Sequence, residues 1–464
     1  MRMIPEDTIA AIATPLGSGG LGVIRVSGPA ALSVADRLFR SSVPLSQVPS
    51  HTLHHGLLVD GEEPLDDAVA AVFRGPRSYT GEDVVELSCH GSPALLRRAL
   101  AACLASGARI AGPGEFTRRA FLNGRMDLAQ AEAVAALVAA RSEEVRRWSL
   151  HQLRGGLSVR IKELRGRVLD ALARLEAALD FSEDEVPEFT REDIVRTISA
   201  LLGEVDALLS TADRGRLFRE GLKAVLAGRP NTGKSSLFNA LLDSDRAIVH
   251  ESPGTTRDVL EESLTVEGLP VTLTDTAGLR AGTEPVEAEG VSRARKALEG
   301  ADVALWVLDA SKPLRPEDLR AADTVRKAIA VFNKMDLVRL GPSEKADLDR
   351  SARAAAPAVG RSVFVSARTG EGLDDLRKAL ASLPAAEGRD AAEGPTLIVD
   401  RHIVLVREAS AALARCLRAA QAGEREECLA VDLRRALNAL DQISGTDVSD
   451  DVLNAIFSKF CVGK

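Results

Sequence analysis

A glycine-rich segment at residues 228–235 has the residue types and spacing of a phosphate-binding loop. It reads Gly-Arg-Pro-Asn-Thr-Gly-Lys-Ser, and the apolar run 223–227 precedes it. A strand that feeds such a loop into a helix directs backbone N–H groups at one anionic phosphate. We therefore expect Lys234 to reach the β- and γ-phosphates of a nucleotide and the Ser235 hydroxyl to ligate Mg²⁺.

Further motifs follow in the order of a guanine-nucleotide site. They are Gly-Thr-Thr-Arg-Asp at 254–258, Asp-Thr-Ala-Gly at 275–278, Asn-Lys-Met-Asp at 333–336 and Ser-Ala-Arg at 366–368. Asp275 can hold Mg²⁺ through water, and Thr256 can ligate it only when the γ-phosphate is present. The Asp336 carboxylate can accept hydrogen bonds from N1–H and the amine of guanine, which predicts GTP rather than ATP.

The predicted GTP contacts gather these motifs with their neighbours, and the predicted Mg²⁺ ligands are two of them, Ser235 and Thr256. The full set is Asn231, Thr232, Gly233, Lys234, Ser235, Ser236, His250, Glu251, Ser252, Pro253, Gly254, Thr255, Thr256, Asp275, Thr276, Ala277, Gly278, Asn333, Lys334, Asp336, Ser366, Ala367 and Arg368.

The elements around these motifs predict a multidomain chain of α/β plus α class. Residues 220–385 alternate short apolar runs with helical patterns, which indicates a Ras-like α/β domain with a mostly parallel sheet. Residues 123–219 and 386–464 carry helical periodicity, and we expect them to form one helical domain interrupted by the Ras-like domain. Residues 1–122 mix alternating segments with one helical stretch and predict a small N-terminal α/β domain.

Composition limits the class of protein. The 464 residues suggest about three domains. A net charge of −8 argues against a protein that coats nucleic acid nonspecifically, although a local basic face remains compatible with it. The 5 cysteines show no metal or disulfide spacing. With no signal-like or membrane-spanning apolar run, we expect a cytoplasmic protein without a membrane partner.

Motifs outside the nucleotide-binding region give the chain a family resemblance. They are Thr-Ile-Ala-Ala-Ile-Ala-Thr-Pro at 8–15, Tyr-Thr-Gly-Glu-Asp-Val-Val-Glu at 79–86, Pro-Gly-Glu-Phe-Thr-Arg-Arg-Ala-Phe-Leu-Asn at 113–123 and Cys-Val-Gly-Lys at 461–464. Together with the GTPase motifs, they make essentially the whole chain resemble the MnmE (TrmE) family of tRNA-modification GTPases.

The resemblance implies how GTP would be hydrolysed. Ras-type enzymes place a water-orienting glutamine directly after Asp-x-x-Gly, where this chain has Leu279. The residues alone leave Glu284, Glu287 and Glu289 open as its replacement, and the family alignment implies Glu287.

No arginine finger is visible, and the resemblance implies a K⁺ ion in its place. Asn231 would serve as a catalytic residue and K⁺ ligand together with His250, Ser252 and Thr255. From the residues alone, Asn231 is also explained as a turn former.

For the N-terminal domain the resemblance implies a site for a tetrahydrofolate derivative, in the 5-formyl or methylene form. Its contacts would be Arg25, Glu86, Arg125 and Lys464, although each could also be a surface charge. The spacing G-x-G-x-x-G at 17–22 fits a dinucleotide site, but the alternating residues 23–26 follow it where that site requires a helix.

The implied function is a K⁺-stimulated GTPase that forms a homodimer and a heterotetramer with the FAD-containing protein MnmG (GidA). The pair would install an aminomethyl or carboxymethylaminomethyl group at C5 of the wobble uridine, U34, of certain tRNAs. Two alternatives remain open. A ribosome-assembly GTPase shares Thr-Thr-Arg-Asp but usually carries a KH-like module where this chain predicts helices. A folate-dependent one-carbon transferase would use GTP only as a regulator.

Overall fold

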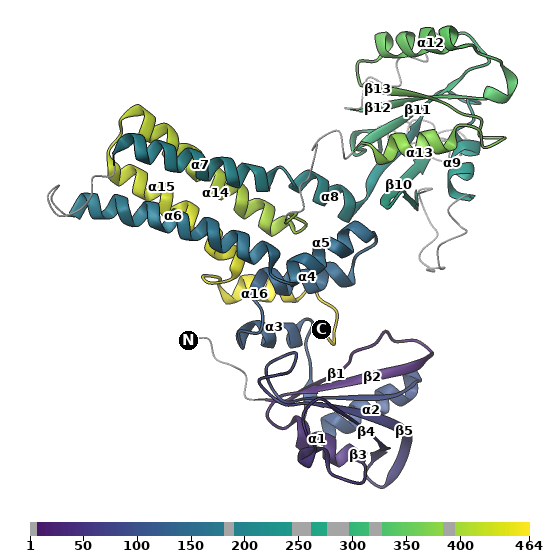
Figure 1. Cartoon of the computed structure of the whole chain (residues 1–464). Helices are drawn as coiled ribbons and strands as arrows, with labels where there is room; N and C mark the ends of the chain where they lie inside the picture. The colour runs from purple at the N-terminus through teal and green to yellow at the C-terminus, as the bar shows by residue number, and fades with distance from the viewer. Residues whose placement is uncertain (1–6, 181–189, 244–260, 276–296, 315–326, 384–394) are drawn as a thin grey trace, which may run out of the picture. The chain divides into compact units, whose positions relative to one another are not determined.

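The computed structural model describes residues 7–180, 190–243, 261–275, 297–314, 327–383 and 395–464 (Figure 1). Contacts divide the chain into two units. The first contains Met1–Ala139, Ser149–Asp206 and Asp400–Lys464, and the second contains Ala140–Trp148 and Ala207–Val399. Helices α5 (Glu143–Leu153) and α7 (Arg191–Leu209) each cross from one unit into the other.

The N-terminal part of the first unit is a seven-stranded sheet with strand order β3-β4-β5-β6-β2-β1-β7. Its strands are β1 (Ile9–Ile12), β2 (Gly19–Ser27), β3 (Phe39–Arg40), β4 (Thr52–Asp60), β5 (Glu63–Phe73), β6 (Val84–Gly91) and β7 (Arg109–Ile110). Helices α1 (Ala31–Leu38) and α2 (Pro93–Ala105) share a buried apolar core with the sheet. A separate cluster packs Phe116 of α3 (Glu115–Leu122) against Ile9 and Ala11 of β1. Residues 19–22 already belong to β2, so the G-x-G-x-x-G spacing at 17–22 does not open a helix.

The rest of the first unit is helical. Its helices are α4 (Leu128–Val138), α6 (Gly156–Asp180), α14 (Asp400–Ala422), α15 (Glu426–Ser444) and α16 (Asp450–Phe457), with most of α7 and residues 149–153 of α5. Helix α15 packs against both α14 and α6, and these helices run alongside one another in Figure 1. Val168, Leu172 and Leu175 of α6 are buried, and their three- and four-residue spacing places them on one face of the helix. Two helical segments far apart in sequence therefore form one body.

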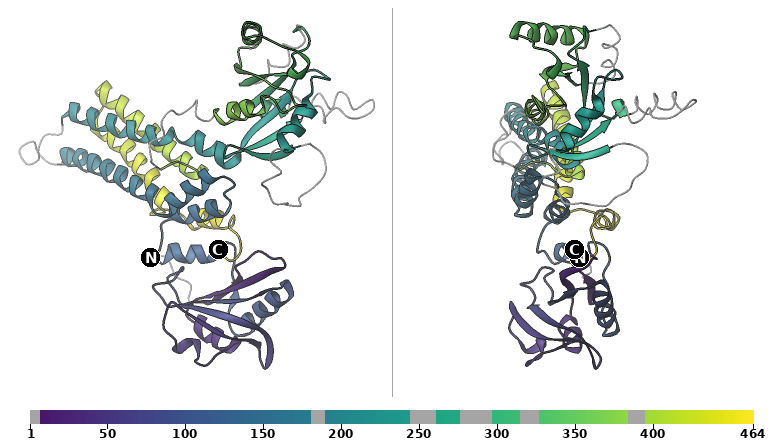
Figure 2. Two further views of the ribbon diagram at one scale, coloured as in Figure 1. Left: turned by 45° about the vertical axis from the view of Figure 1, so that its right-hand side comes forward. Right: turned by 90° about the vertical axis from the view of Figure 1, so that its right-hand side faces the viewer.

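The second unit contains a six-stranded sheet with strand order β13-β12-β11-β8-β10-β9. The strands are β8 (Leu222–Ala227), β9 (Glu261–Val266), β10 (Leu269–Asp275), β11 (Val303–Asp309), β12 (Ala328–Asn333) and β13 (Val359–Phe364). Every pairing is parallel except that of β9 with β10. Helices α9 (Lys234–Asp243) and α13 (Leu373–Ala381) pack on one face, and α12 (Pro342–Ala355) packs on the other (Figure 2).

These elements confirm the predicted fold class, with an α/β domain inserted into a helical one. Strand β9 was not predicted, because among its described side chains the buried apolar ones are only Leu264 and Val266. The predicted boundaries 1–122, 123–219, 220–385 and 386–464 stay predictions. Contacts group α8 (Ala212–Glu220) and residues 140–148 with the Ras-like unit, because Trp148 packs edge-on against Phe218 of α8. In the described ranges, no helix is long and apolar enough to cross a membrane.

Candidate functional site

The phosphate loop connects β8 to α9, and two of its glycines fit positions that no other residue could occupy without strain. Gly228 has φ 142° and Gly233 has φ 92°. A Cβ atom would lie 2.4 Å from the Val307 carbonyl oxygen at Gly228, and 2.3 Å from Asn333 Nδ2 at Gly233. Only glycine allows this conformation and this close approach of the backbone. The loop is therefore closely packed against β11 and β12.

Lys234 and Ser235 begin helix α9 and carry the chemistry of the loop. Lys234 Nζ donates to the carbonyl oxygens of Gly228 and Arg229 at 3.0 and 2.8 Å, so the ammonium group lies over the loop. Ser235 Oγ donates to Asp275 Oδ2 at 2.8 Å, at the end of β10. A hydroxyl and a carboxylate side by side are the hard oxygen groups that Mg²⁺ prefers. This pair fits the predicted metal position.

Asn333, at the end of β12, joins the phosphate loop to the base-reading segments. Its side chain is 2% exposed. Nδ2 donates to the Thr232 carbonyl at 3.0 Å, and Oδ1 accepts from the backbone N–H groups of Lys334 at 2.8 Å and Ala367 at 3.0 Å. One amide therefore fixes three loops, which makes Asn333 a supporting residue for both the phosphate loop and the base pocket.

Asp336 is held in place by the segment that follows β13. Its Oδ1 accepts a hydrogen bond from Ser366 Oγ at 2.7 Å, and Arg368 lies 3.9 Å from Oδ2 with an exposed side chain. The hydrogen bond leaves acceptor capacity on the carboxylate for the donors of a guanine edge. A cavity of about 490 Å³ opens beside this residue and is lined also by Leu340 and Lys345.

These residues all lie at the carboxyl ends of parallel strands, where open α/β sheets bind ligands. Asp309 ends β11 in the same way and was not among the predicted site residues. An acidic residue directly after the apolar run 303–308 was the signal that could have found it. Its Oδ2 lies 2.8 Å from Lys334 Nζ. Burial raises the pKa of Asp309, but hydrogen bonds from Lys334 and Ser311 outweigh burial and hold the pKa below its ordinary value.

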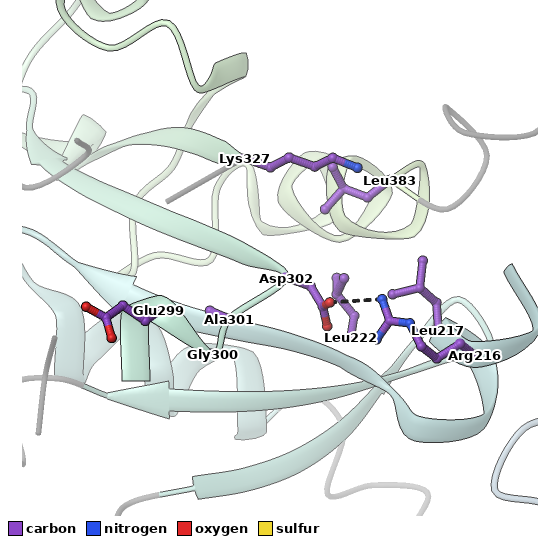
Figure 3. A pocket seen from close by; sticks show the side chains of 9 residues that line it. All are labelled: Arg216, Leu217, Leu222, Glu299, Gly300, Ala301, Asp302, Lys327 and Leu383. Atoms are coloured by element: carbon purple, nitrogen blue, oxygen red, sulfur yellow. Dashed lines mark hydrogen bonds and ion pairs between the residues drawn. The ribbon is translucent and has the colours of Figure 1, made fainter. Parts of the chain in front are cut away.

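A second cavity lies at the opposite, amino-terminal edge of the same sheet (Figure 3). It has a volume of about 440 Å³ and is lined among others by Arg216, Leu222, Asp302 and Lys327. Arg216 Nη2 lies 3.2 Å from Asp302 Oδ1, and Asp302 Oδ2 accepts from the backbone N–H of Lys223 at 3.0 Å. The ion pair connects α8 to the residue before β11, and the hydrogen bond connects that residue to β8. Because the cavity lies at the edge opposite the phosphate loop, it is not the nucleotide site.

The predicted folate residues are partly brought together in the N-terminal sheet. Arg25 and Glu86 lie opposite each other on β2 and β6, and Arg25 Nε is 2.7 Å from Glu86 Oε1. Arg25 Nη1 also donates to the Gly463 carbonyl at 3.1 Å, which places the segment 461–464 at this pair. The guanidinium lies 5.4 Å from the ring centre of Tyr79, and burial raises the pKa of that tyrosine.

Arg125 and Lys464 are the other two predicted folate contacts. Arg125 Nε donates to the Ser78 carbonyl at 3.1 Å, one residue before Tyr79. The backbone N–H of Lys464 donates to the Cys461 carbonyl at 3.3 Å. Arg125 thus reaches the segment that carries Tyr79, and Lys464 follows directly after the carbonyl that Arg25 contacts.

Comparison with known proteins decides the family. A family model described as MnmE helical domain matches residues 128–461, and one described as GTP-binding protein TrmE N-terminus matches residues 8–125. A protein of Symbiobacterium thermophilum named tRNA modification GTPase MnmE is 46% identical over 99% of this chain and 100% of its own length. A protein of the same name from Geobacillus kaustophilus is 42% identical over 100% of both chains.

The chain belongs to the MnmE family. The resemblance inferred from the motifs is thereby confirmed. Several residues predicted on the MnmE pattern lie outside the described residues, so their positions stay predictions. They are the catalytic Glu287, the segment His250, Glu251, Ser252, Pro253, Gly254, Thr255 and Thr256, and the motif residues Thr276, Ala277 and Gly278.

Proposed function

We propose that this chain is a GTP hydrolase that acts in tRNA modification. The observation that carries the proposal is the arrangement of the base-reading segments. Ser366 donates a hydrogen bond to the Asp336 carboxylate, and the neighbouring Asn333 side chain connects these segments to the phosphate loop. The full-length relatives named tRNA modification GTPase support it from the sequence side. Asp336 selects guanine by its charge and geometry, since adenine offers no matching pair of donors.

In finer detail, we propose that Ser235 and Thr256 ligate Mg²⁺ and that Glu287 orients the attacking water. K⁺ would be held by Asn231, His250, Ser252 and Thr255 and would supply charge during hydrolysis. Asn231 has φ 65°, a left-handed conformation that asparagine adopts more readily than most other residues. Comparing GTP turnover in KCl and in NaCl tests the role of K⁺. Equal rates in the two salts would contradict this part of the proposal.

The proposed tRNA reaction is the addition of an aminomethyl or carboxymethylaminomethyl group at C5 of U34. It would be carried out by a homodimer in complex with the FAD-containing MnmG. The N-terminal domain would hold the tetrahydrofolate donor, because a carboxylate such as Glu86 can pair with a pterin edge while cations meet the glutamate moiety. The neighbouring Arg25, between Glu86 and the Gly463 carbonyl, supports this placement.

Mass spectrometry of wobble nucleosides in tRNA from cells lacking the gene tests the function. We expect uridine to replace the modified nucleoside, and a plasmid copy should restore the modification. Unchanged modification with altered ribosomal subunit profiles would instead favour a ribosome-assembly GTPase. Modification by the purified protein without a flavoprotein would favour a one-carbon transferase that GTP only regulates.

A further inference from the structure

We propose that Asp309 is a positioning residue of the nucleotide site, which holds Lys334 against the phosphate loop and so fixes the conformation of Asn231. The inference rests on the proposed function only in assuming that the site binds GTP and GDP. It assigns a role to a residue at the end of β11 that lies outside every nucleotide-binding motif of the sequence.

The Asp309 carboxylate is oriented by its own loop. Its Oδ1 accepts from the backbone N–H of Ser311 at 3.0 Å and from the Ser311 hydroxyl at 2.6 Å. These two bonds occupy one oxygen and direct the other toward Lys334 Nζ, at 2.8 Å. The Asp309 side chain is only 10% exposed. The ion pair is therefore more strongly desolvated than an ordinary surface pair, and its geometry is set before a ligand arrives.

Lys334 uses its second contact to reach the phosphate loop. Its Nζ donates to the Asn231 carbonyl at 2.6 Å. Lys334 and Asn231 have φ 68° and 65°, a region that non-glycine residues rarely occupy. Such strain persists only where surrounding contacts hold it, and here one ammonium group joins both strained residues to one carboxylate.

The connection has a counterpart that does not involve Asp309. Asn333, the residue before Lys334, donates to the carbonyl of Thr232, the residue after Asn231. Two consecutive residues of the base-reading segment thus hold two consecutive carbonyls of the phosphate loop. Asn333 is anchored by backbone groups, whereas the position of the Lys334 ammonium depends on the charge of Asp309. Loss of that charge should loosen Asn231 while leaving the Asn333 connection intact.

Dissociation of a fluorescent GDP analogue from the full chain measures this role. Asp309→Asn keeps an acceptor for Ser311 but removes the charge, and we expect dissociation to become about tenfold faster, the size expected for a lost hydrogen bond between charged groups. In a Lys334→Met background the same change should add nothing, because its partner is gone. Lys312→Met is the matched control. Its Nζ lies 3.9 Å from the same carboxylate on an exposed side chain, so we expect a change within about twofold.

Ser311→Ala keeps the experiment decisive if Asp309→Asn folds poorly. It removes one hydrogen bond that orients the carboxylate, and we expect a smaller acceleration in the same direction, about threefold. Dissociation unchanged in both variants, or effects of Asp309→Asn and Lys334→Met that multiply, would overturn the inference. If the unaltered chain binds no guanine nucleotide, the proposed function fails as well. If it binds GDP but Asp309→Asn and Ser311→Ala leave GDP dissociation unchanged, the role of Asp309 fails and the proposed function stands.

Discussion

His402 Nε2 lies 2.7 Å from Glu132 Oε2 in the interior of the helical part, where the His402 side chain is 0% exposed. Arg401 contacts the same carboxylate, with Nε 2.9 Å from Glu132 Oε1. Burial raises the pKa of Glu132, but His402 and Arg401 outweigh it and lower the pKa to about 2. The cluster joins α4 to α14 and so connects the two segments of the helical domain that the Ras-like unit separates in sequence.

The helical domain should lose stability in acid through this carboxylate. Because the pKa of Glu132 falls from 4.5 to about 2 on folding, its contribution is complete above about pH 4.5 and is lost as the pH falls toward 2. The loss is on the order of 3 kcal/mol, since each pKa unit corresponds to about 1.4 kcal/mol. Calorimetry of the full chain at a series of pH values should show its helical-domain transition falling over this range. The same fall in a Glu132→Gln variant would contradict the assignment.

Breaking the cluster at neutral pH should be costly. Glu132→Gln leaves Arg401 and His402 without a buried anion, and we expect the free energy of opening of α14 to fall by about 3 kcal/mol. Native-state hydrogen exchange of the α14 amides measures it. Glu143→Gln is the matched control, because Glu143 pairs with Arg146 on the surface and its side chain is 60% exposed, so we expect no measurable change in the exchange of the α14 amides. Equal effects of the two changes would show that burial of the pair does not matter.

The sequence could predict the nucleotide site more fully than the helical core, for a physical reason. Lys234, Asp275, Asn333 and Asp336 stand in local motifs, and the loops that carry them follow buried strands whose apolar runs are visible in the sequence. The Glu132–His402 pair joins positions far apart in the chain, so no local pattern of residues predicts it. Asp309 could be predicted only in part. The apolar run before it predicts a strand, but the residue itself belongs to no known motif.

The same distinction holds in the N-terminal domain. Alternating apolar residues predicted β2 and β6, which place Arg25 opposite Glu86. The contact between Arg25 and the Gly463 carbonyl depends on tertiary packing of the far end of the chain, for which β-strand patterning carries no signal. The family resemblance supplied this association, and the residue pattern by itself did not.

Base selection should follow Asp336. In Asp336→Asn the amide would present a donor where guanine also presents its amine, and we expect GTP affinity to fall about a hundredfold. Xanthosine triphosphate, which carries a carbonyl at that position, should bind the variant more tightly than GTP does. Competition against a fluorescent nucleotide measures both affinities. Asp347→Asn, at a surface residue paired with Arg350, should change neither affinity. Retention of GTP preference by Asp336→Asn would show that another residue reads the base.

Asp302 should contribute more than Arg216 to the stability of the Ras-like unit, because it contacts both α8 and β8 (Figure 3). Arg216→Met removes partly exposed ion pairs with Asp302 and Glu220, whose side chains are 20% and 39% exposed, and should cost less than about 1 kcal/mol. Asp302→Ala also removes the acceptor for the Lys223 N–H, so we expect it to cost about 1 kcal/mol more than Arg216→Met does. Fluorescence of the buried Trp306 in a Trp148→Phe background can follow unfolding of this unit by urea. Equal costs for the two variants would mean that the hydrogen bond from the Lys223 N–H to Asp302 contributes nothing to the stability of this unit.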